Sequence, residues 1–359
     1  MMLRPVLSAQ PLNGGQPPSD GRALPVKSFV FGDERPFPQC HASTLLRLPD
    51  GSFLVAWFGG TEEKDDDVGI WTATGRPTSE ESSGWSDPQE VAKIRPEPHW
   101  NPVLFQAPDG AIYLYFKVGK EIKRWETWVM TSTDQGQTWS EATELVPGDR
   151  GGRGPVRNKP IILSDGTWLA GASHEEGAWT AFADRSLDQG RSWSRSPYLE
   201  VNSVDGKVPG LIQPTLWESA PGRVHMLLRS TVGAIYRSDS EDYGQTWTPA
   251  YRTDLPNPNS GIDLTRLPDG TLALAYNRDD QNWGSRATLS IALSPDNGAT
   301  WPRVLDVERG EPDDEFSYPA IVSFGDTLAL SYTWKRKRIA LWLGTAADIP
   351  ESSTALESR

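Results

Sequence analysis

The sequence predicts an all-β protein built as a six-bladed β-propeller, and three observations support this fold. Four copies of a Ser-x-Asp-x-Gly-x-Thr/Ser-Trp box begin at Ser132, Ser186, Ser240 and Ser294, each 54 residues after the last. Self-similarity at about this period is typical of stacked or circular repeat proteins. Six tight-turn signals recur in step with the boxes, and no stretch shows the sustained periodicity of a helix.

The repeating unit is predicted from these turns and boxes together. Each turn separates two β-rich runs, such as Thr44–Leu48 and Phe53–Trp57, and its glycine supplies the positive φ that a hairpin needs. A third strand, a box and a fourth strand follow, which makes one four-stranded antiparallel blade. The six turns are Pro49–Gly51, Pro108–Gly110, Ser164–Gly166, Pro221–Gly222, Pro268–Gly270 and Gly325–Asp326.

Two further features complete the ring. A decayed fifth box ends at Trp85, which lies 54 residues before Trp139, and the sixth unit has no box. The run Val26–Phe31 is expected to add a strand to the last blade, because closure removes long exposed sheet edges. The predicted organisation is an N-terminal tail over 1–25, one propeller over 26–347 and a C-terminal tail over 348–359.

The bulk composition excludes several classes of protein. The chain has 359 residues and a net charge of −13, from 35 basic and 48 acidic residues, which argues against a nucleic-acid partner. It has no apolar run of membrane-spanning length and no apolar signal-peptide core near its start. With one cysteine, we expect a cytoplasmic protein without membrane attachment. Neither zinc-ligand spacing nor a phosphate loop is present, so we expect no metal and no cofactor.

The propeller geometry predicts where a site lies. The first strand of each blade begins near the axis on one face of the ring, so the residues that lead into these strands converge. They are His41, Trp100, Asn101, Asn158, Lys159, Gln213, Asn259, Asp263 and Tyr318. Arg229 and Arg286, on second strands, run back toward the same region. Such a polar basin is a candidate binding site, and its two arginines favour an anionic ligand.

Tryptophan is unusually abundant, with 16 residues. Flat indole rings suit the apolar faces of sugars, although packing between sheets is an equally simple use for them. The basic run Lys335–Arg338 is expected to be a solvated strand or turn.

Asp-containing boxes inside a six-bladed pattern resemble the sialidase (neuraminidase) superfamily with its BNR repeats, over roughly residues 36–345 and most of all its bacterial "predicted neuraminidase" branch. The resemblance implies that Arg229 and Arg286 are the second and third arginines of a substrate-binding triad. It further implies that Tyr318 is the nucleophile and that Asp67 is the acid/base, with Glu63, Asp65 and Asp66 as competitors.

Two departures from the family pattern bear on the substrate. His41 stands where the family has its first arginine, and Gln213 stands where the family has a glutamate beside the tyrosine. Three functions therefore remain open. They are an exo-acting glycoside hydrolase that removes a terminal acidic sugar, a polysaccharide lyase that uses His41 and Tyr318 for β-elimination of a uronate, and a non-catalytic carbohydrate-binding propeller.

Overall fold

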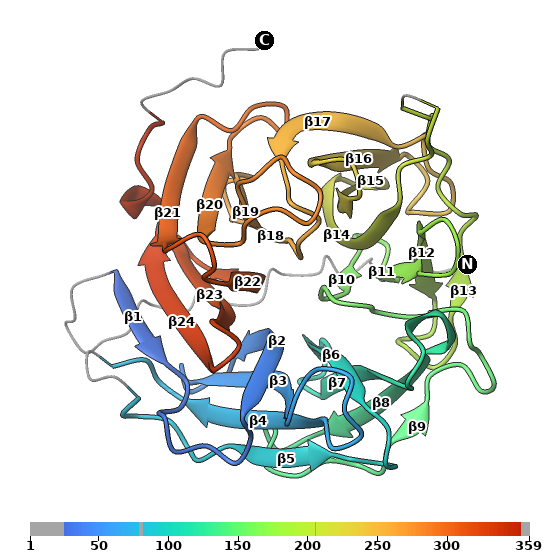
Figure 1. The fold of residues 1–359 in the computed structure, drawn as a ribbon. Helices are drawn as coiled ribbons and strands as arrows, with labels where there is room; N and C mark the ends of the chain where they lie inside the picture. The colour runs from blue at the N-terminus through green and yellow to red at the C-terminus, as the bar shows by residue number, and fades with distance from the viewer. Residues whose placement is uncertain (1–24, 79–81, 205, 353–359) are drawn as a thin grey trace, which may run out of the picture.

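The protein is a ring of six four-stranded antiparallel sheets around a central axis, which confirms the predicted all-β, six-bladed fold (Figure 1). The structure is a computed structural model that describes residues 25–78, 82–204 and 206–352. Within those ranges the only helical segments are two single 3-10 turns, η1 (Ile122–Arg124) and η2 (Ala346–Asp348).

The sheets follow one another in sequence, and we number them as blades 1 to 6. Blade 1 contains β2 (Gln39–Arg47), β3 (Phe53–Gly60), β4 (Gly69–Gly75) and β5 (Gln89–Ala92). Blade 2 contains β6 (His99–Gln106), β7 (Ile112–Val118), β8 (Glu126–Ser132) and β9 (Thr143–Glu144). Blade 3 contains β10 (Ile161–Ile162), β11 (Trp168–His174), β12 (Thr180–Ser186) and β13 (Ser194–Arg195).

The second half of the ring repeats this order. Blade 4 contains β14 (Leu211–Ala220), β15 (Arg223–Ser230), β16 (Ala234–Ser240) and β17 (Tyr251–Pro256). Blade 5 contains β18 (Asp263–Arg266), β19 (Leu272–Asn277), β20 (Thr288–Ser294) and β21 (Arg303–Arg309). Blade 6 contains β22 (Phe316–Phe324), β23 (Thr327–Trp334), β24 (Arg338–Thr345) and β1 (Val26–Phe29).

The N-terminal strand β1 closes the ring as expected. It pairs antiparallel with β24, from Val26 opposite Leu343 to Phe29 opposite Ala340. β22 of this last blade contacts β2 of the first, so the two ends of the ring meet (Figure 1).

Packed structure continues past the predicted propeller boundary at residue 347. Ile349 is fully buried, and Glu351 forms a bridge with Arg303 of β21. Most of the predicted tails over 1–25 and 348–359 lie outside the described residues.

The boxes form the turns between the third and fourth strands of blades 2 to 5. In the first box, Ser132 Oγ donates to Asp134 Oδ1 at 2.8 Å and accepts from the Gly136 amide at 2.8 Å. Thr138 donates to both carboxylate oxygens of Asp134, at 2.9 Å from its amide and 2.5 Å from its hydroxyl. A Cβ on Gly136 would lie 2.8 Å from Leu54 of blade 1, so the turn packs directly on its neighbour. The boxes are scaffold.

Candidate active site

A backbone irregularity recurs where the first strands begin. Residues in the left-handed region stand at Ala42 (φ 57°), Asn101 (φ 42°), Gln213 (φ 54°), Asn259 (φ 56°) and Tyr318 (φ 52°). In β2, β6, β14 and β22 the pairing register shifts at this point, as in a β-bulge. Bulges redirect side chains, and such strain is retained where the surroundings enforce it. The repeat therefore places one left-handed residue at this point in five of the six blades, and in four of them the strand pairing is interrupted there.

Three of these positions, Asn101, Gln213 and Tyr318, line a cavity of about 240 Å³. Six predicted site residues line it: Trp100, Asn101, Gln213, Arg229, Arg286 and Tyr318. The volume lies below the ~300–1,000 Å³ of drug-sized ligand sites, so it suits about one sugar ring. The predicted convergence of sequence-distant residues is thus present for these six.

Tyr318 and Arg229 form the centre of the cavity. Nη1 of Arg229 donates to the Tyr318 hydroxyl at 2.9 Å and to Gln213 Oε1 at 3.2 Å, while Nε donates to Asn259 Oδ1 at 2.9 Å. Because Arg229 is only 2% exposed, these bonds hold both its guanidinium and the phenol oxygen in place.

The tyrosine ring lies among cations. The guanidinium carbons are 5.3 to 5.8 Å from its centroid, for Arg157, Arg286 and Arg229. Arg157 precedes β10 of blade 3, and its Nη2 donates to the backbone carbonyls of Tyr318 and Pro319 in blade 6. Burial lowers the pKa of Arg157 to about 10, although the nearby Asp263 carboxylate opposes this effect. Its Nε and Nη1 are buried without a partner among the described residues.

His41 also packs against Tyr318, with ring centroids 4.1 Å apart. Its Nδ1 lies 2.9 Å from the hydroxyl of Thr333, which also accepts from the Ala42 amide. Burial, together with the positive charges of Arg336 and Arg286, lowers the pKa of His41 well below its ordinary value. The imidazole is therefore neutral at pH 7.

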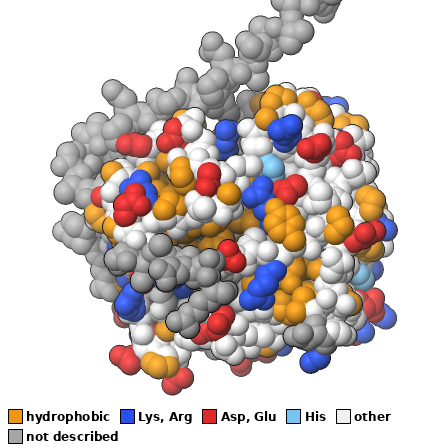
Figure 2. Space-filling view, turned by 90° about the horizontal axis from the view of Figure 1, so that it is seen from above, with side chains coloured by type: hydrophobic (Ala, Val, Ile, Leu, Met, Phe, Trp, Pro, Cys, Tyr) orange, Lys and Arg blue, Asp and Glu red, His pale blue; other side chains and the backbone are white. Residues whose placement is uncertain are grey.

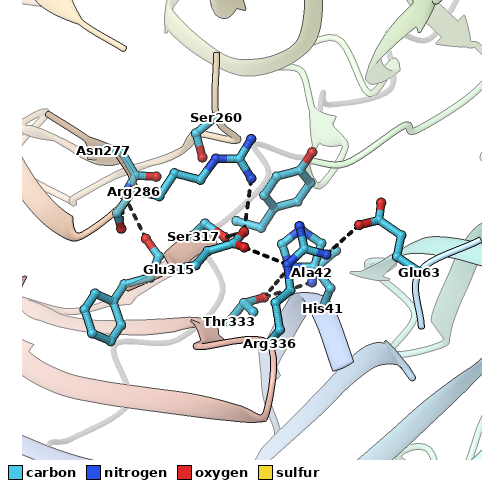
Figure 3. A network of polar contacts seen from close by, with 12 residues as sticks. His41, Ala42, Glu63, Ser260, Asn277, Arg286, Glu315, Ser317, Thr333 and Arg336 are labelled. Atoms are coloured by element: carbon cyan, nitrogen blue, oxygen red, sulfur yellow. Dashed lines mark hydrogen bonds and ion pairs between the residues drawn. The ribbon is translucent and has the colours of Figure 1, made fainter. Parts of the chain in front are cut away.

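A chain of alternating charges forms one wall of the cavity (Figure 3). Glu315 accepts from Arg286 Nη1 at 3.0 Å through one oxygen and from Arg336 Nε at 2.8 Å through the other. Arg336 Nη1 in turn donates to Glu63 at 2.5 Å. Burial disfavours the charged forms of both residues, but the ion pairs and hydrogen bonds between them outweigh burial. The pKa of Glu315 is therefore lowered and that of Arg336 is raised.

Four predicted site residues lie outside this cavity lining, namely His41, which packs on the Tyr318 ring, and Asp67, Lys159 and Asn158. Asp67 is exposed and accepts from the amide and hydroxyl of Thr61, which closes the base of its own loop. Lys159 Nζ is paired with Asp263 at 2.8 Å and with the Leu264 carbonyl at 2.8 Å. Asn158 is 1% exposed and donates to the backbone carbonyl of Gln213 at 3.0 Å, behind the cavity wall.

The structure also adds residues that sequence reasoning did not select. Glu175 lines the cavity, and burial raises its pKa while Arg229, Lys117 and a hydrogen bond with Gln213 oppose the shift. Its Oε1 is buried without a hydrogen-bond partner among the described residues. No motif marks this loop residue, so only the fold could have found it.

Arg336 is the second such addition, and it corrects the expectation for the run Lys335–Arg338. Lys335 and Arg336 adopt left-handed conformations (φ 53° and 57°), and the turn folds Arg336 into the cavity. Arg338 is 9% exposed and the Arg336 side chain is 26% exposed, so two of the four basic residues are wholly or mostly withdrawn from solvent.

Two tryptophans stand at the cavity. Trp179 and Trp283 meet edge to face with centroids 6.3 Å apart, and Trp283 is 62% exposed although its φ is 60°. An exposed aromatic ring on a strained backbone is a candidate sugar-stacking surface.

The face of the molecule shown in Figure 2 mixes both signs of charge. On the face in Figure 2, Lys and Arg side chains are interspersed with Asp and Glu, and no extended basic area is seen. Among the described residues, no helix is long and apolar enough to cross a membrane.

Comparisons with solved structures agree with this architecture. A microbial sialidase from the Hadza, Hz136, superimposes with a TM-score of 0.71 at 18% identity, over 87% of this chain and 66% of that one. Trypanosoma rangeli sialidase in complex with sialic acid gives 0.62 at 14% identity, over 90% and 57%. At these identities the likeness shows the fold alone.

Curated relatives extend the comparison to sequence. A sialidase of Micromonospora viridifaciens is 27% identical over 229 residues, which is 57% of this chain but 33% of that protein. A sialidase of Paraclostridium sordellii is 24% identical over 202 residues, which is 47% of this chain and 48% of that protein. The chain thus spans half or less of the relatives' length. The family model for the BNR repeat-like domain matches residues 51–330, and this chain belongs to that family.

Proposed function

We propose that the protein is a sialidase-like glycoside hydrolase that removes a terminal acidic sugar, sialic acid or a related one, from a glycan. The observation that carries this proposal is the Tyr318 hydroxyl, held 2.9 Å from Arg229 in a cavity that Arg286 and Arg336 also line. Fork-shaped guanidinium donors suit a sugar carboxylate, and tyrosine is the known alternative nucleophile among glycosidases. The cavity volume favours exo action on one terminal residue.

The residues divide the chemistry in a defined way. The phenol oxygen of Tyr318 bonds to the anomeric carbon as the bond to the leaving oxygen breaks, and water later releases the sugar. Glu175, whose pKa is raised, takes the phenol proton. A carboxylic acid of the 61–67 loop protonates the leaving oxygen. We propose Glu63 for this step, because it lines the cavity whereas Asp67, the sequence-based choice, closes the loop base.

A second candidate is β-elimination of a uronate, and His41 favours it. A neutral imidazole 4.1 Å from the Tyr318 ring is available as a base for the proton beside a carboxylate. In this reaction the carbon–oxygen bond breaks without water, and an unsaturated sugar forms.

A panel of acidic oligosaccharides and a fluorogenic sialoside tests both candidates. A hydrolase releases a saturated acidic monosaccharide, whereas a lyase releases a product with new ultraviolet absorbance. In either case Tyr318→Phe is expected to lose at least about 100-fold in kcat, with binding retained. If the parent turns over no member of the panel but binds acidic sugars, the protein is a carbohydrate-binding propeller instead.

A further inference from the structure

A group of polar side chains on blade 4 lies apart from the cavity. Gln213 lines the cavity near the start of β14, and Ser219 lies near the end of the same strand. At about 3.3 Å per residue, roughly 20 Å separate the two. Trp217 of β14 pairs with His225 of β15, which in turn pairs with Asp239 of β16. Because paired residues share a face of the sheet, the end of β14 lies beside a histidine and a carboxylate.

Ser219 is placed as a nucleophile requires. The pairing of β14 with β15 shifts between Glu218 and Ala220, which leaves Ser219 outside the ladder, as in a β-bulge. Bulges redirect side chains and are common next to active sites. Ser219 Oγ lies 2.7 Å from His225 Nε2, whereas its other acceptor, the Arg223 carbonyl, is 3.5 Å away. Since the shorter contact is the stronger one, the hydroxyl proton points at the imidazole.

The imidazole is oriented from its other side. His225 Nδ1 lies 2.5 Å from Asp239 Oδ1, and because a carboxylate only accepts, Nδ1 carries a proton. Arg237 Nη2 also lies 3.0 Å from Nδ1, but Arg237 donates to the same carboxylate through Nε at 2.8 Å, and Tyr251 donates to its other oxygen at 2.9 Å. Burial alone would raise the pKa of Asp239, but hydrogen bonds from His225 and Arg237 lower it to about 2. The carboxylate is therefore charged at neutral pH, and Nε2 is the nitrogen left to accept from Ser219.

A donor for developing negative charge is present as well. Asn297, in the fourth box on blade 5, accepts from Trp217 Nε1 at 2.7 Å through its Oδ1. An indole N–H can only donate, so this bond fixes the amide with Nδ2 turned toward His225, 3.3 Å from Nε2. The Ser219 hydroxyl and the Asn297 amide thus reach the same nitrogen. A side-chain amide beside a nucleophile can stabilise an oxyanion.

We propose that Ser219, His225 and Asp239 form a catalytic site, separate from the cavity, that hydrolyses short-chain carboxylic esters. Ser219 Oγ bonds to the ester carbonyl carbon as its proton passes to His225 Nε2, and Asn297 Nδ2 donates to the oxyanion. The bond to the alcohol oxygen then breaks as His225 returns the proton to that oxygen, which leaves the acyl group on Ser219. Water, deprotonated by the same imidazole, attacks this acyl group and releases the acid.

The position of Ser219 sets the class of substrate. Ser219 is partly exposed, and Ala220 and Pro221 after it are exposed, so an ester carried on a larger molecule can approach from solvent. Trp217 stacks on the His225 ring with centroids 4.9 Å apart and occupies the space beside the imidazole. Both features favour a small acyl group such as acetyl.

Labelling with a fluorophosphonate tests the nucleophile directly, because this reagent transfers its phosphonyl group to an activated serine with loss of fluoride. Peptide mass spectrometry of the full chain is expected to find an adduct on Ser219, and none in Ser219→Ala or His225→Gln. Hydrolysis of p-nitrophenyl acetate by Ser219→Ala is expected to fall at least about 100-fold in kcat/KM. Asn297→Asp keeps the acceptor for Trp217 but removes the amide donor, so its kcat/KM is expected to fall about tenfold or more.

Ser194→Ala is the matched control, since it removes an exposed serine hydroxyl from β13 of the neighbouring blade. It is expected to hydrolyse the ester as the parent does and to leave the adduct on Ser219. Urea midpoints within error of the parent show that Ser219→Ala and Asn297→Asp are folded. An adduct on another residue in place of Ser219, no adduct at all, or an unchanged rate in Ser219→Ala overturns the proposal. In that case the three side chains only join the strands of blade 4.

Discussion

The ring that positions the cavity is held at its centre by Asp263, and removing this carboxylate gives the sharpest stability prediction. Asp263 is 2% exposed and accepts from Lys159 Nζ at 2.8 Å, from the Ile321 amide at 2.9 Å and from Thr215 Oγ1 at 3.0 Å. Lys159 precedes blade 3, Thr215 belongs to blade 4 and Ile321 to blade 6. One carboxylate therefore connects four blades.

The magnitude follows from what Asp263→Ala leaves behind. In this variant the mostly buried Lys159 ammonium and the buried Ile321 amide lose their shared acceptor. Breaking such a buried ion pair lowers the free energy of unfolding by about 3–5 kcal/mol. Removing both charges, as in Asp263→Ala/Lys159→Met, is expected to cost at least about 1 kcal/mol less than the sum of the single changes. The control is Asp254→Ala, which changes an exposed aspartate on β17 of blade 4. Its free energy of unfolding is expected to stay within about 0.5 kcal/mol of the parent value.

Equilibrium urea unfolding at neutral pH, followed by tryptophan fluorescence, compares the parent with Asp263→Ala, Lys159→Met, the double variant and the Asp254→Ala control. Asp263 does not hold the blades together in this way if Asp263→Ala lowers the free energy of unfolding by less than about 1 kcal/mol. The same conclusion follows if the loss in the double variant equals the sum of the losses in the two single variants.

Further predictions concern the boxes, the buried thiol and the cavity mouth. Hydrogen bonds from Thr138 and Ser192 lower the pKa values of Asp134 and Asp188 to about 2. Because the unfolded value is about 3.9, their contribution to stability is present above that pH and is lost as pH falls toward 2. Asp188→Asn should therefore show a shallower fall of the urea midpoint over this range; an unchanged slope argues against the shift. Burial raises the pKa of Cys40, so native protein should resist thiol reagents that label it in urea. Trp283→Ala should leave the urea midpoint unchanged and raise KM for oligosaccharides; a lowered midpoint with unchanged KM would mean that the ring is structural.

The fold was predictable because it rests on periodic signals. Turn glycines and boxes repeat at positions fixed by the blade, and β1 and its pairing with β24 follow from the need to close the ring. The convergence of Gln213, Arg229 and Tyr318 also needs only the topology, since each stands at the start of a first strand or the end of a second one.

Loop conformation set the limit of prediction. Within the 61–67 loop, five acidic residues are indistinguishable in sequence, and only the backbone decides that Glu63 lines the cavity while Asp67 bonds to Thr61. Arg336 was hidden for a related reason. A run of four basic residues indicates a solvated turn unless left-handed backbone at two of them folds one side chain inward. Lys159 was expected among the site residues, and its ion pair with Asp263 could not be foreseen because the two residues lie 104 positions apart in the sequence.

The proposed hydrolase mechanism requires the Tyr318 oxygen to bond covalently to an acidic sugar. Incubation with a fluorinated acidic glycosyl fluoride, which slows release of the intermediate, followed by peptide mass spectrometry tests it most directly. We expect one added glycosyl group on the peptide that contains Tyr318, and none in Tyr318→Phe. An adduct on another residue, or full turnover of substrate by Tyr318→Phe, would contradict it.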